Sequence, residues 1–485
     1  METLRDFERD LEEMREYYSH GKTKEASWRK TQLKGLLTLL KEKEGDILNA
    51  LKQDLGKHQI GILIKTLNLA LDSLRGWMSG RKAKLPQIAL LTSAEIVPEP
   101  LGLVLIISSW NFHFGLSLEP MIVALAAGKT VVLKPSELAP ASASLLATAT
   151  STYLDNKAVK IIQGGPSVGE QLIQQRWDKI FFTVGSAHVG RIVMSAAVKH
   201  LTPVTLELGG KCPAVLDSLS SSWDIKVAVK RIVHGKFGCC AGQACRAIDY
   251  ILVEKKFTRT MMELMKSMIK EMFGENPKES PSIARIINKQ HLLRLKNLLK
   301  DPHVDASTVF GGSVDKDNLF IEPTILVDHP LQAEIMTDEI FGPLLPIITP
   351  EKIEDSIQFI NSKPKALAIY CFTKNKTLQR RMISETSSGS VTFNDTIIQY
   401  AADTLPFGGI GGSGFGRYRG KFSFDTFSHE KAVTRRSFLT EFWFRFPPWN
   451  NHKFQLLAFT FNYDYLGLVL VILGLKSYRQ GLNDI

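Results

Sequence analysis

Short apolar runs alternate with helical patterns between residues 101 and 200, and this alternation restricts the fold more than any other feature. Four runs have the length and composition of buried strands: 101–107, 130–133, 159–162 and 179–183. Helical patterns separate them, at 121–127, 141–153 and 191–200. Such alternation predicts an α/β fold, in which crossover connections join the strands of a parallel sheet. Ligands bind at the carboxyl ends of such strands, where the polar or glycine-rich loops are 108–114, 134–137 and 185–190.

The flanking regions extend this pattern in both directions. Helices are expected at 25–55 and 72–81, before the alternation begins. A second alternation follows residue 245, with a helix expected at 258–272 and strands at 250–253, 323–327, 366–372 and 389–393. The glycine-rich stretch 406–414 is typical of a tight loop. A flexible linker is the alternative, but the apolar neighbours favour a packed loop.

The composition describes an ordinary folded protein and excludes several classes. The 485 residues suffice for two or three domains with large cores, and 44% hydrophobic with 22% charged residues argues against disorder. The net charge of +11 suits an anionic cofactor or a membrane surface, but the absence of a basic stripe interleaved with aromatic residues argues against nucleic-acid binding. Five unevenly spaced cysteines predict a reducing compartment, with neither a disulfide framework nor a metal site.

The two ends of the chain differ in character. Residues 1–16 are rich in acids and arginines without the apolar core of a signal peptide, which predicts a cytoplasmic protein. Residues 454–475 carry one charge, Asp464, and end in the apolar run 466–475. That run is shorter than the roughly 20 residues that span a bilayer. An interfacial or tail-anchored helix at the cytosolic face of an intracellular membrane and a helix over a pocket mouth both stay open.

Two residues are candidates for covalent catalysis on a carbonyl group. Cys245 ends the run Gly242-Gln243-Ala244-Cys245, and a thiol attacks as thiolate only where a base or a positive charge supports it. Glu207 lies between two leucines, where a carboxylate is costly without a partner. Taken singly, Cys245 suits a small buried hydrophobic position and Glu207 a buried ion pair. Together they predict thiol catalysis, in which Glu207 supplies the base or activates a later water.

The loop 185–190 is a candidate phosphate site. It joins the strand 179–183 to the helix 191–200, so free amides and the helix dipole favour an anion there. The spacing lacks the G-x-G-x-x-G fingerprint, and a simple turn is the alternative. Lys134 and Glu137 close the preceding strand–helix unit and can hold a ribose by hydrogen bonds. The negative charge of Glu137 repels a 2′-phosphate and favours NAD over NADP.

Seven short motifs follow one another along the chain. They are Trp110-Asn111-Phe112, Lys134-Pro135-Ser136-Glu137, Gly185-Ser186, Glu207-Leu208-Gly209-Gly210-Lys211, Gly242-Gln243-x-Cys245, Glu339-Ile340-Phe341-Gly342-Pro343 and Pro406-Phe407-Gly408-Gly409. In this order they resemble the aldehyde dehydrogenase superfamily, over roughly residues 5–450. The segment from Phe424 to Lys431 and the apolar tail resemble its class 3, fatty-aldehyde-type branch, especially the plant members.

The resemblance implies the aldehyde dehydrogenase fold. This is an α/β architecture with a Rossmann-like parallel-sheet NAD domain, an α/β catalytic domain and a small β oligomerisation arm. The expected bounds are 1–86 and 99–206 for the NAD domain, 207–405 for the catalytic domain, 87–98 and 406–445 for the arm with the glycine-rich loop, and 446–485 for the hydrophobic tail. The resemblance also implies a homodimer, built through the arm near 87–98 and a strand near 426–438.

The resemblance further implies a role for each site residue. Cys245 is expected to attack the aldehyde carbon, with the Asn111 amide and the Cys245 backbone N–H holding the oxyanion. Glu207 is expected to activate the water that releases the acid. Eight residues are expected to bind the cofactor, which is NAD or alternatively NADP: Trp110, Lys134, Glu137, Gly185, Ser186, Gly190, Glu339 and Phe341. Glu339 is expected at the nicotinamide ribose, with Phe341 beside it.

Four departures from the family pattern leave room for a weakened enzyme. Arg246 follows the nucleophile, where the family usually has a small or apolar residue. It either lowers the pKa of the thiol or points away into a salt bridge, and we expect the salt bridge. His113 stands where proline is common, and Gly412 replaces a usual acidic residue. The segment after Lys57-His58 is short.

The expected function is NAD(P)-dependent oxidation of aldehydes, especially medium- to long-chain aliphatic ones, to carboxylic acids through a cysteine thiohemiacetal and thioester. A semialdehyde dehydrogenase of the same fold is one alternative. It needs a cationic anchor in the substrate tunnel, for which Arg246 is the visible candidate. A weakened or non-catalytic membrane-associated paralogue is the other, and the intact Cys245, Glu207 and Asn111 argue against it.

Overall fold

The computed structural model describes residues 2–56, 61–85, 92–439 and 441–475. Two compact units make up the chain. The first comprises Met1–Leu74 and Pro100–Ser428, and the second comprises Arg75–Glu99 and His429–Ile485. The start of the short segment after His58 and residues 87–91 of the expected arm lie outside the described residues.

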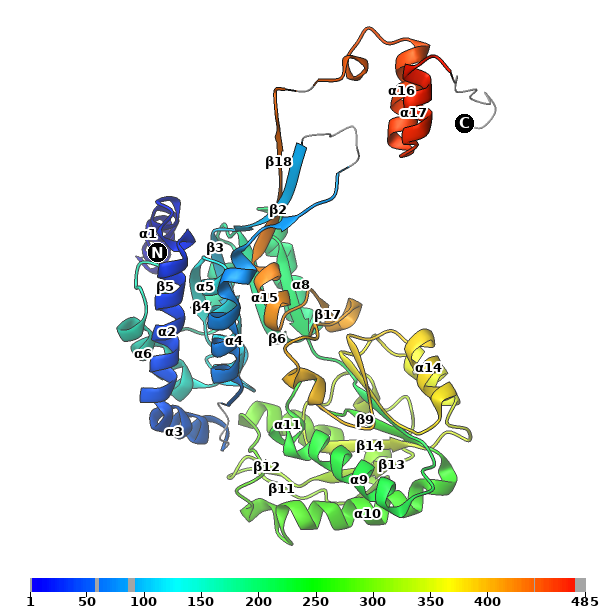
Figure 1. The fold of residues 1–485 in the computed structure, drawn as a ribbon. Helices are drawn as coiled ribbons and strands as arrows, with labels where there is room; N and C mark the ends of the chain where they lie inside the picture. Colours follow the sequence, from blue (N-terminus) through cyan, green and yellow to red (C-terminus); the bar gives the residue numbers. More distant parts are fainter. Residues whose placement is uncertain (1, 57–60, 86–91, 440, 476–485) are drawn as a thin grey trace. The chain divides into compact units, whose positions relative to one another are not determined.

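The first unit contains a six-stranded sheet with the strand order β17-β7-β6-β3-β4-β5 (Figure 1). Its strands are β3 (Leu103–Ile107), β4 (Thr130–Lys134), β5 (Val159–Ile161), β6 (Lys179–Gly185), β7 (Val204–Leu208) and β17 (Gly414–Phe415). The neighbours from β5 to β7 are parallel, as the alternation predicts, whereas β17 pairs antiparallel with β7. The glycine-rich stretch thus leads into an edge strand, and the expectation of a packed loop rather than a linker is confirmed.

Helices cover both faces of this sheet. They are α1 (Glu2–Ser19), α2 (Ala26–Glu42), α3 (Glu44–Leu55), α5 (His113–Ala126), α6 (Pro140–Tyr153), α7 (Pro166–Ile173), α8 (Ala187–Val198) and α15 (Gly420–Thr426). Leu103 and Leu105 of β3 share a core with α1, α7 and α8. Val104 and Ile106 point to the opposite face, where α5 contacts β3. This alternation is the period of two that strand side chains follow.

A seven-stranded sheet, ordered β10-β13-β14-β9-β8-β15-β16, forms the rest of the first unit. Its strands are β8 (Pro213–Leu216), β9 (Tyr250–Val253), β10 (Thr308–Phe310), β13 (Thr324–Val327), β14 (Leu344–Ile348), β15 (Ala368–Phe372) and β16 (Ser390–Phe393), all parallel to their neighbours except β10. The small ribbon of β11 (Val314–Asp315) and β12 (Phe320–Ile321) stands apart. The helices are α9 (Ser222–Val233), α10 (Lys255–Phe273), α11 (Lys289–Lys300), α12 (Pro302–Asp305), α13 (Asp355–Asn361) and α14 (Lys376–Glu385). One core joins the strands to α11, α13 and α14.

The second unit contains the three-stranded sheet β1-β2-β18, entered from α4 (Gly61–Met78). Its strands are β1 (Arg81–Lys82), β2 (Thr92–Pro100) and β18 (Ser428–Arg436), and β2 and β18 lie side by side in Figure 1. Ion pairs join the two long strands, Lys431 with Glu99 at 2.5 Å and Arg435 with Glu95. The described part of the expected arm and the strand expected near 426–438 therefore pair with each other.

The apolar tail folds as two short helices, α16 (Asn451–Phe461) and α17 (Tyr465–Ile472). Between them Asp464 caps α17, because its carboxylate accepts a hydrogen bond from the Gly467 backbone N–H at 2.7 Å. A Cβ on Gly467 would lie 2.5 Å from the Phe459 ring, so glycine allows the two helices to pack closely. Among the described residues, no helix has the length and hydropathy needed to cross a membrane.

Several of the expected helix boundaries are wrong, since the helices expected at 121–127 and 191–200 begin at His113 and Ala187. The helix expected at 72–81 ends at Met78, and Arg81 already belongs to β1. Gly80 allows this turn into the sheet, since a Cβ there would lie 3.1 Å from the backbone oxygen of Ile96. The helix expected at 25–55 is two helices that meet at Lys43. The acidic side chains in the first turn of α3 favour a new helix N-terminus at that point.

Candidate active site

Cys245 follows a tight turn that requires glycine at one position. The π-helix His234–Gly238 leads into this turn, where Cys240 and Gly242 have φ angles of 53° and 78°. A Cβ on Gly242 would lie 2.2 Å from the backbone oxygen of Gly342. Left-handed backbone at a non-glycine residue such as Cys240 costs energy and concentrates at functional sites. The turn holds the Cys245 side chain in the protein, with 4% of it exposed.

Gln243 holds the turn in place through both ends of its side chain. Its Nε2 donates to the carbonyl oxygens of Cys240 at 3.0 Å and Arg285 at 2.9 Å. Its Oε1 accepts a hydrogen bond from the Ile287 backbone N–H at 3.2 Å. The sequence motif contains Gln243, but sequence reasoning assigns it no role. The available signal was a polar amide two residues before a candidate nucleophile, and the structure shows that this amide is fully buried.

Asn111 lies after β3 and reaches the same turn. Its Nδ2 donates to the Gln243 carbonyl oxygen at 3.0 Å, and its own backbone oxygen accepts a hydrogen bond from Cys240 Sγ at 3.4 Å. A side-chain amide carries two N–H donors, so one remains for another acceptor. The structure thus brings Asn111 to the Cys245 turn, where an oxyanion donor is needed.

Glu207 is buried in β7 between two other strands. It is opposite Thr183 of β6 and Gly414 of β17, and only 2% of it is exposed. Both carboxylate oxygens are buried without a hydrogen-bond partner among the described residues. Burial raises the pKa of Glu207 well above its usual range. The ion pair, which was the alternative interpretation of Glu207, is therefore absent from the described residues, and burial favours the protonated form of the carboxyl group.

The thiol of Cys245 is protonated in this setting. Burial raises its pKa to about 12, and the positive charge of Arg246 acts in the opposite direction. Glu339 and Glu207, when ionised, raise the pKa of Cys245 further. The three side chains therefore influence one another electrostatically. The thiol needs a base at the moment of attack, because only the thiolate is a strong nucleophile.

Arg246 stacks on aromatic rings. The prediction that it forms a salt bridge is therefore wrong. Its guanidinium lies 3.8 Å from the centroid of the Tyr400 ring and 5.0 Å from that of Phe112. Among the described residues no carboxylate lies within ion-pair distance of it, and its Nε is buried without a partner. The Tyr400 hydroxyl donates to Glu119 at 2.6 Å, and Glu119 also pairs with Arg419. The Glu119 carboxylate is therefore already bound by Tyr400 and Arg419, and it forms no ion pair with Arg246.

Glu339 packs its carboxylate against the backbone that follows Glu207. A Cβ on Gly209 would lie 2.0 Å from a carboxylate oxygen of Glu339, so only glycine fits there. Burial, with the negative charge of Asp249, raises the pKa of Glu339 to about 8. The backbone amide of Gly210 and the charge of Lys211 act in the opposite direction. The motif glycines thus make room for the carboxylate that is expected at the nicotinamide ribose.

A buried ion pair anchors the loop that carries Glu339. Lys211 pairs with Asp249 at 2.5 Å and also donates to the carbonyl oxygens of Ile335 at 2.8 Å and Asp338 at 3.0 Å. The other oxygen of Asp249 accepts from the Ile340 backbone N–H at 2.9 Å. Every donor of the lysine has an acceptor, which is what a buried charge requires. Lys211 belongs to one of the sequence motifs, but its partner Asp249 was not predicted from the sequence.

Trp110 and Phe341 meet at this loop. Their ring centroids lie 5.4 Å apart in an edge-to-face arrangement, and the Trp110 ring is also 5.4 Å from His291. Phe341 has a φ of 50°, which a bulky residue rarely adopts. The aromatic contact holds this strained residue directly after the Glu339 segment.

The other expected cofactor residues lie at the carboxyl ends of strands in the six-stranded sheet. Lys134 ends β4 and pairs with the exposed Glu137 at 2.9 Å. Ser186 caps the N-terminus of α8, and its hydroxyl accepts from the Val189 backbone N–H at 3.3 Å. Gly190 instead serves packing, since a Cβ there would lie 3.3 Å from the Leu208 side chain. The edge offers a charged pair and a capped helix N-terminus, which suit ribose hydroxyls and phosphate.

A Cβ on Gly185 would come within 2.4 Å of the Phe182 ring, so Gly185 is required for the tight turn from β6 into α8. Two departures from the family pattern are also accommodated. His113 is the first residue of α5, a position where proline is favoured because its N–H has no helical partner. Its ring is buried 3.9 Å from a carboxylate oxygen of Asp54. Gly412 has room for a side chain, since a Cβ would lie 3.6 Å from Pro364.

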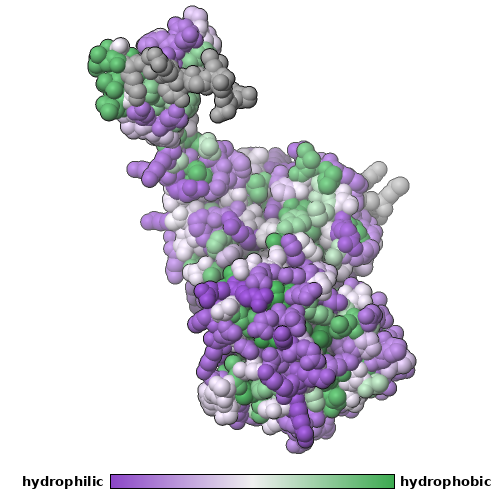
Figure 2. All heavy atoms as spheres, turned by 90° about the vertical axis from the view of Figure 1, so that its right-hand side faces the viewer, coloured by the Kyte–Doolittle hydropathy of each residue, from purple (hydrophilic) through white to green (hydrophobic). Residues whose placement is uncertain are grey.

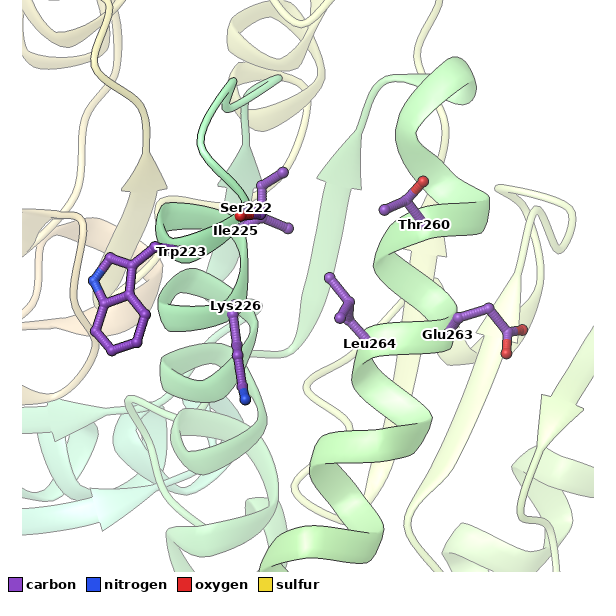
Figure 3. A pocket seen from close by; sticks show the side chains of 7 residues that line it. All are labelled: Ser222, Trp223, Ile225, Lys226, Thr260, Glu263 and Leu264. Carbon is purple, nitrogen blue, oxygen red and sulfur yellow. The ribbon is translucent and has the colours of Figure 1, made fainter.

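A separate cavity of about 550 Å³ lies between α9 and α10 (Figure 3). It is lined by Ser222, Trp223, Ile225, Lys226, Thr260, Glu263 and Leu264. Figure 3 shows Trp223 on the side of α9 away from α10. The lining contains none of the expected site residues, so this cavity is distinct from the site at Cys245.

Residues 2–433 match the protein family described as the aldehyde dehydrogenase family. The chain belongs to the aldehyde dehydrogenase family. It is 52% identical to aldehyde dehydrogenase family 3 member F1 of Arabidopsis thaliana, over 98% of this chain and 100% of that protein. It is 41% identical to aldehyde dehydrogenase family 3 member A2 of Rattus norvegicus, over 96% and 97% of the two chains. The expected resemblance to class 3 and its plant members is confirmed.

A solved structure supports the same conclusion. The substrate-bound state of Staphylococcus aureus AldH matches with a TM-score of 0.90 and 39% identity, over 94% of this chain and 99% of that one. The expected aldehyde dehydrogenase fold is therefore confirmed. As a family member, this aldehyde dehydrogenase oxidises aldehydes with NAD or NADP.

Proposed function

We propose that Cys245, Asn111 and Glu207 carry out the oxidation. Cys245 loses its thiol proton to solvent and adds as the thiolate to the aldehyde carbon, and the resulting oxyanion accepts hydrogen bonds from the Asn111 side chain and the Cys245 backbone N–H. A bound nicotinamide cofactor would supply the hydride acceptor for this carbon, so that Cys245 would carry the substrate as a thioester. Glu207 takes a proton from the water that hydrolyses the thioester. In balance, aldehyde, water and NAD⁺ give carboxylate, NADH and two protons.

The unpaired buried polar atoms at the Cys245 turn are the observation that carries this proposal. Asn111 Oδ1 and both carboxylate oxygens of Glu207 are buried without a hydrogen-bond partner in the described part of the chain. Burial of such groups lowers stability unless they are paired. A fold that retains them next to a buried thiol is typical of a catalytic site.

The cofactor proposal follows from the residues at the sheet edge. We propose that NAD is preferred over NADP, because the exposed carboxylate of Glu137 lies where it would repel a 2′-phosphate. Lys134 and Glu137 are proposed to bind the adenosine ribose, and the α8 N-terminus at Ser186 to bind the pyrophosphate. Glu339 is proposed to bind the nicotinamide ribose. The six-stranded sheet would then belong to the cofactor domain and the seven-stranded sheet to the catalytic domain.

The surroundings of Cys245 support an aliphatic substrate of medium to long chain. Small buried side chains and two partly buried apolar ones form a cluster there: Cys239, Ala244, Ala247, Phe112 and Ile397. Such a surface gains free energy by removing methylene groups from water, about 0.8 kcal/mol for each one buried. A longer alkyl chain should therefore lower KM until the cluster is filled.

The decisive experiment measures NADH formation from hexanal and NAD by the full chain. The Cys245→Ala variant should lose turnover, because it lacks the thiol that is proposed to add to the aldehyde carbon. Cys371→Ala is the matched control, since Cys371 lies in the core of the seven-stranded sheet. Hexanal-dependent NADH formation that survives in Cys245→Ala would overturn the proposal.

We also propose contact with the cytosolic face of a membrane through residues 454–475. Large apolar side chains of the two tail helices are exposed, among them Phe454, Phe461, Leu466, Val469 and Ile472, each at 50% or more. Figure 2 shows hydrophobic residues gathered on this helical hairpin. A pair of helices too short to span suits the membrane interface.

A homodimer through β18 is proposed as well. In the sheet order β1-β2-β18, β18 is an edge strand, and an edge strand offers unpaired backbone groups to a second copy. Light scattering of the full chain should give the mass of a dimer, and a monomer mass would contradict the proposal.

A further inference from the structure

Arg246 places a buried positive charge directly after Cys245. Its side chain is 6% exposed, and the Tyr400 and Phe112 rings stack against the guanidinium. Stacking occupies the faces of the guanidinium plane, whereas its N–H donors point outward along the edge of that plane. The rings therefore fix the orientation of the group and leave its hydrogen-bond donors unused.

No carboxylate in the described part of the chain neutralises this charge. Glu119, which Tyr400 brings into the same network, already accepts from the Tyr400 hydroxyl and pairs with Arg419. Arg246 Nε is buried without a hydrogen-bond partner among the described residues. A buried charge without a counter-charge is costly. The arrangement is incomplete without an anion.

The Tyr370 hydroxyl donates to the Arg246 backbone oxygen at 2.7 Å, and apolar side chains lie beside the same turn. The apolar cluster contains Cys239, Ala244 and Ala247 from the segment around Cys245, with Phe112 and Ile397 packed against them from distant segments. Ile397 has a φ of 65°, a conformation that a β-branched residue rarely adopts and that concentrates at ligand sites. Apolar walls with one buried guanidinium suit an aliphatic ligand that ends in an anion.

We propose that Arg246 binds the terminal carboxylate of the aldehyde substrate, so that ω-oxo carboxylates are preferred over neutral aldehydes of the same length. This inference rests on the proposed thiol chemistry at Cys245 and narrows its substrate class. Cys245 adds to the aldehyde carbon, while the carboxylate accepts hydrogen bonds from the in-plane N–H groups of Arg246. Charge-assisted hydrogen bonds of this kind are stronger than neutral ones and give geometric specificity. The product is a dicarboxylate.

The test uses three matched substrate pairs that differ only in the terminal carboxylate. They are 4-oxobutanoate with butanal, 6-oxohexanoate with hexanal, and 9-oxononanoate with nonanal. In the wild type, at least one oxo acid should exceed its neutral partner in kcat/KM. Arg246→Ile should lower kcat/KM for that oxo acid roughly 10- to 100-fold more than it lowers kcat/KM for the neutral aldehyde of the same length. Arg246→Lys should restore part of the loss, and the exposed Arg380→Ile serves as the matched control.

The neutral aldehydes separate the competing explanations. If Arg246→Ile slows the neutral aldehydes and the oxo acids by the same factor, the charge serves the thiol or the fold, and the inference is overturned. It is also overturned if no oxo acid exceeds its neutral partner in the wild type. Turnover of the neutral aldehydes by the wild type in either case would leave the proposed function standing.

A binding measurement covers the case in which the wild type oxidises nothing. In the Cys245→Ala background, calorimetry compares 6-oxohexanoate with hexanal, with and without Arg246→Ile. Preferential binding of the oxo acid that disappears with Arg246→Ile supports the inference without turnover. Equal binding of the two compounds overturns it, independently of the proposed function.

Discussion

Glu207 must change its protonation state during the proposed reaction, and its surroundings make that change costly. Burial without hydrogen-bond partners raises the pKa of its carboxyl group. A general base has to be ionised to accept a proton from water. The rate of thioester hydrolysis should therefore rise as the pH rises through this raised pKa, and it should be lost below it.

Glu207→Gln separates the two halves of the reaction. The glutamine keeps the shape of the side chain but cannot take a proton, so the first equivalent of NADH should still form. Steady-state NADH formation should then fall by about 10²- to 10⁴-fold. Stopped-flow absorbance with hexanal measures the burst and the steady state together. The exposed Glu351→Gln should behave as wild type, and an unchanged steady state in Glu207→Gln would remove Glu207 from the mechanism.

At the residue scale, motifs pointed to the catalytic candidates but not to their partners. Cys245 and Glu207 stand out because a polar group in an apolar setting is readable in the sequence. The stacking of Arg246 on Tyr400 was not readable, because the ring arrives from a distant segment and stacking leaves no local pattern. A salt bridge was expected to stabilise the charge of Arg246, whereas two aromatic rings stack against its guanidinium in the structure.

At the element scale, the turn before Cys245 depends on a single missing side chain. Gly242→Ala should lower the free energy of unfolding by about 1–3 kcal/mol, because its Cβ would meet the Gly342 carbonyl and its φ is positive. The misplaced turn should also reduce hexanal oxidation. Gly412→Ala is the matched control, since a Cβ there makes an ordinary contact. Chemical denaturation and NADH formation measure both variants, and equal stability would contradict the role of the turn.

His113 links three helices and should make the fold sensitive to acid. Burial lowers its pKa to about 4. The neighbouring Asp54 of α3 accepts hydrogen bonds from the first turn of α6, through the backbone N–H groups of Ala141 and Ser142. The unfolded chain gains a proton on this histidine below about pH 6.5, and the folded chain does so only near pH 4. The stability that the neutral ring provides is therefore lost as the pH falls through that window.

His113→Leu should remove this acid sensitivity. Between pH 7 and pH 5 the variant should lose about 2 kcal/mol less stability than the wild type. Asp54 keeps its backbone donors in the variant, so α6 remains capped. Urea denaturation at the two pH values measures the difference, with the exposed His20→Leu as control. A variant that loses stability as steeply as the wild type would rule out His113 as the cause.

Elements with a strong period were predictable and short ones were not. The strands from β3 to β7 follow from their apolar runs, since a buried parallel strand needs no alternation. The strand β17 has two residues, too few for any period, and tertiary contact with Leu206 and Glu207 creates it. The break between α16 and α17 was not predictable either. Asp464 can be recognised as a helix cap only when the start of α17 is known.

At the scale of the whole molecule, the two units allow the oxidation and the membrane contact to be tested separately. All residues proposed for catalysis belong to the first unit, and the apolar hairpin belongs to the second. A chain that ends at Trp449 should therefore oxidise hexanal like the full chain. It should lose flotation with vesicles of mixed neutral and anionic phospholipids, which the full chain should show. A double variant, Leu466→Asp with Val469→Asp, should also stay at the bottom of the gradient, because charges on exposed positions of α17 oppose burial in the lipid interface. Equal flotation of all three chains would place the membrane contact outside the hairpin.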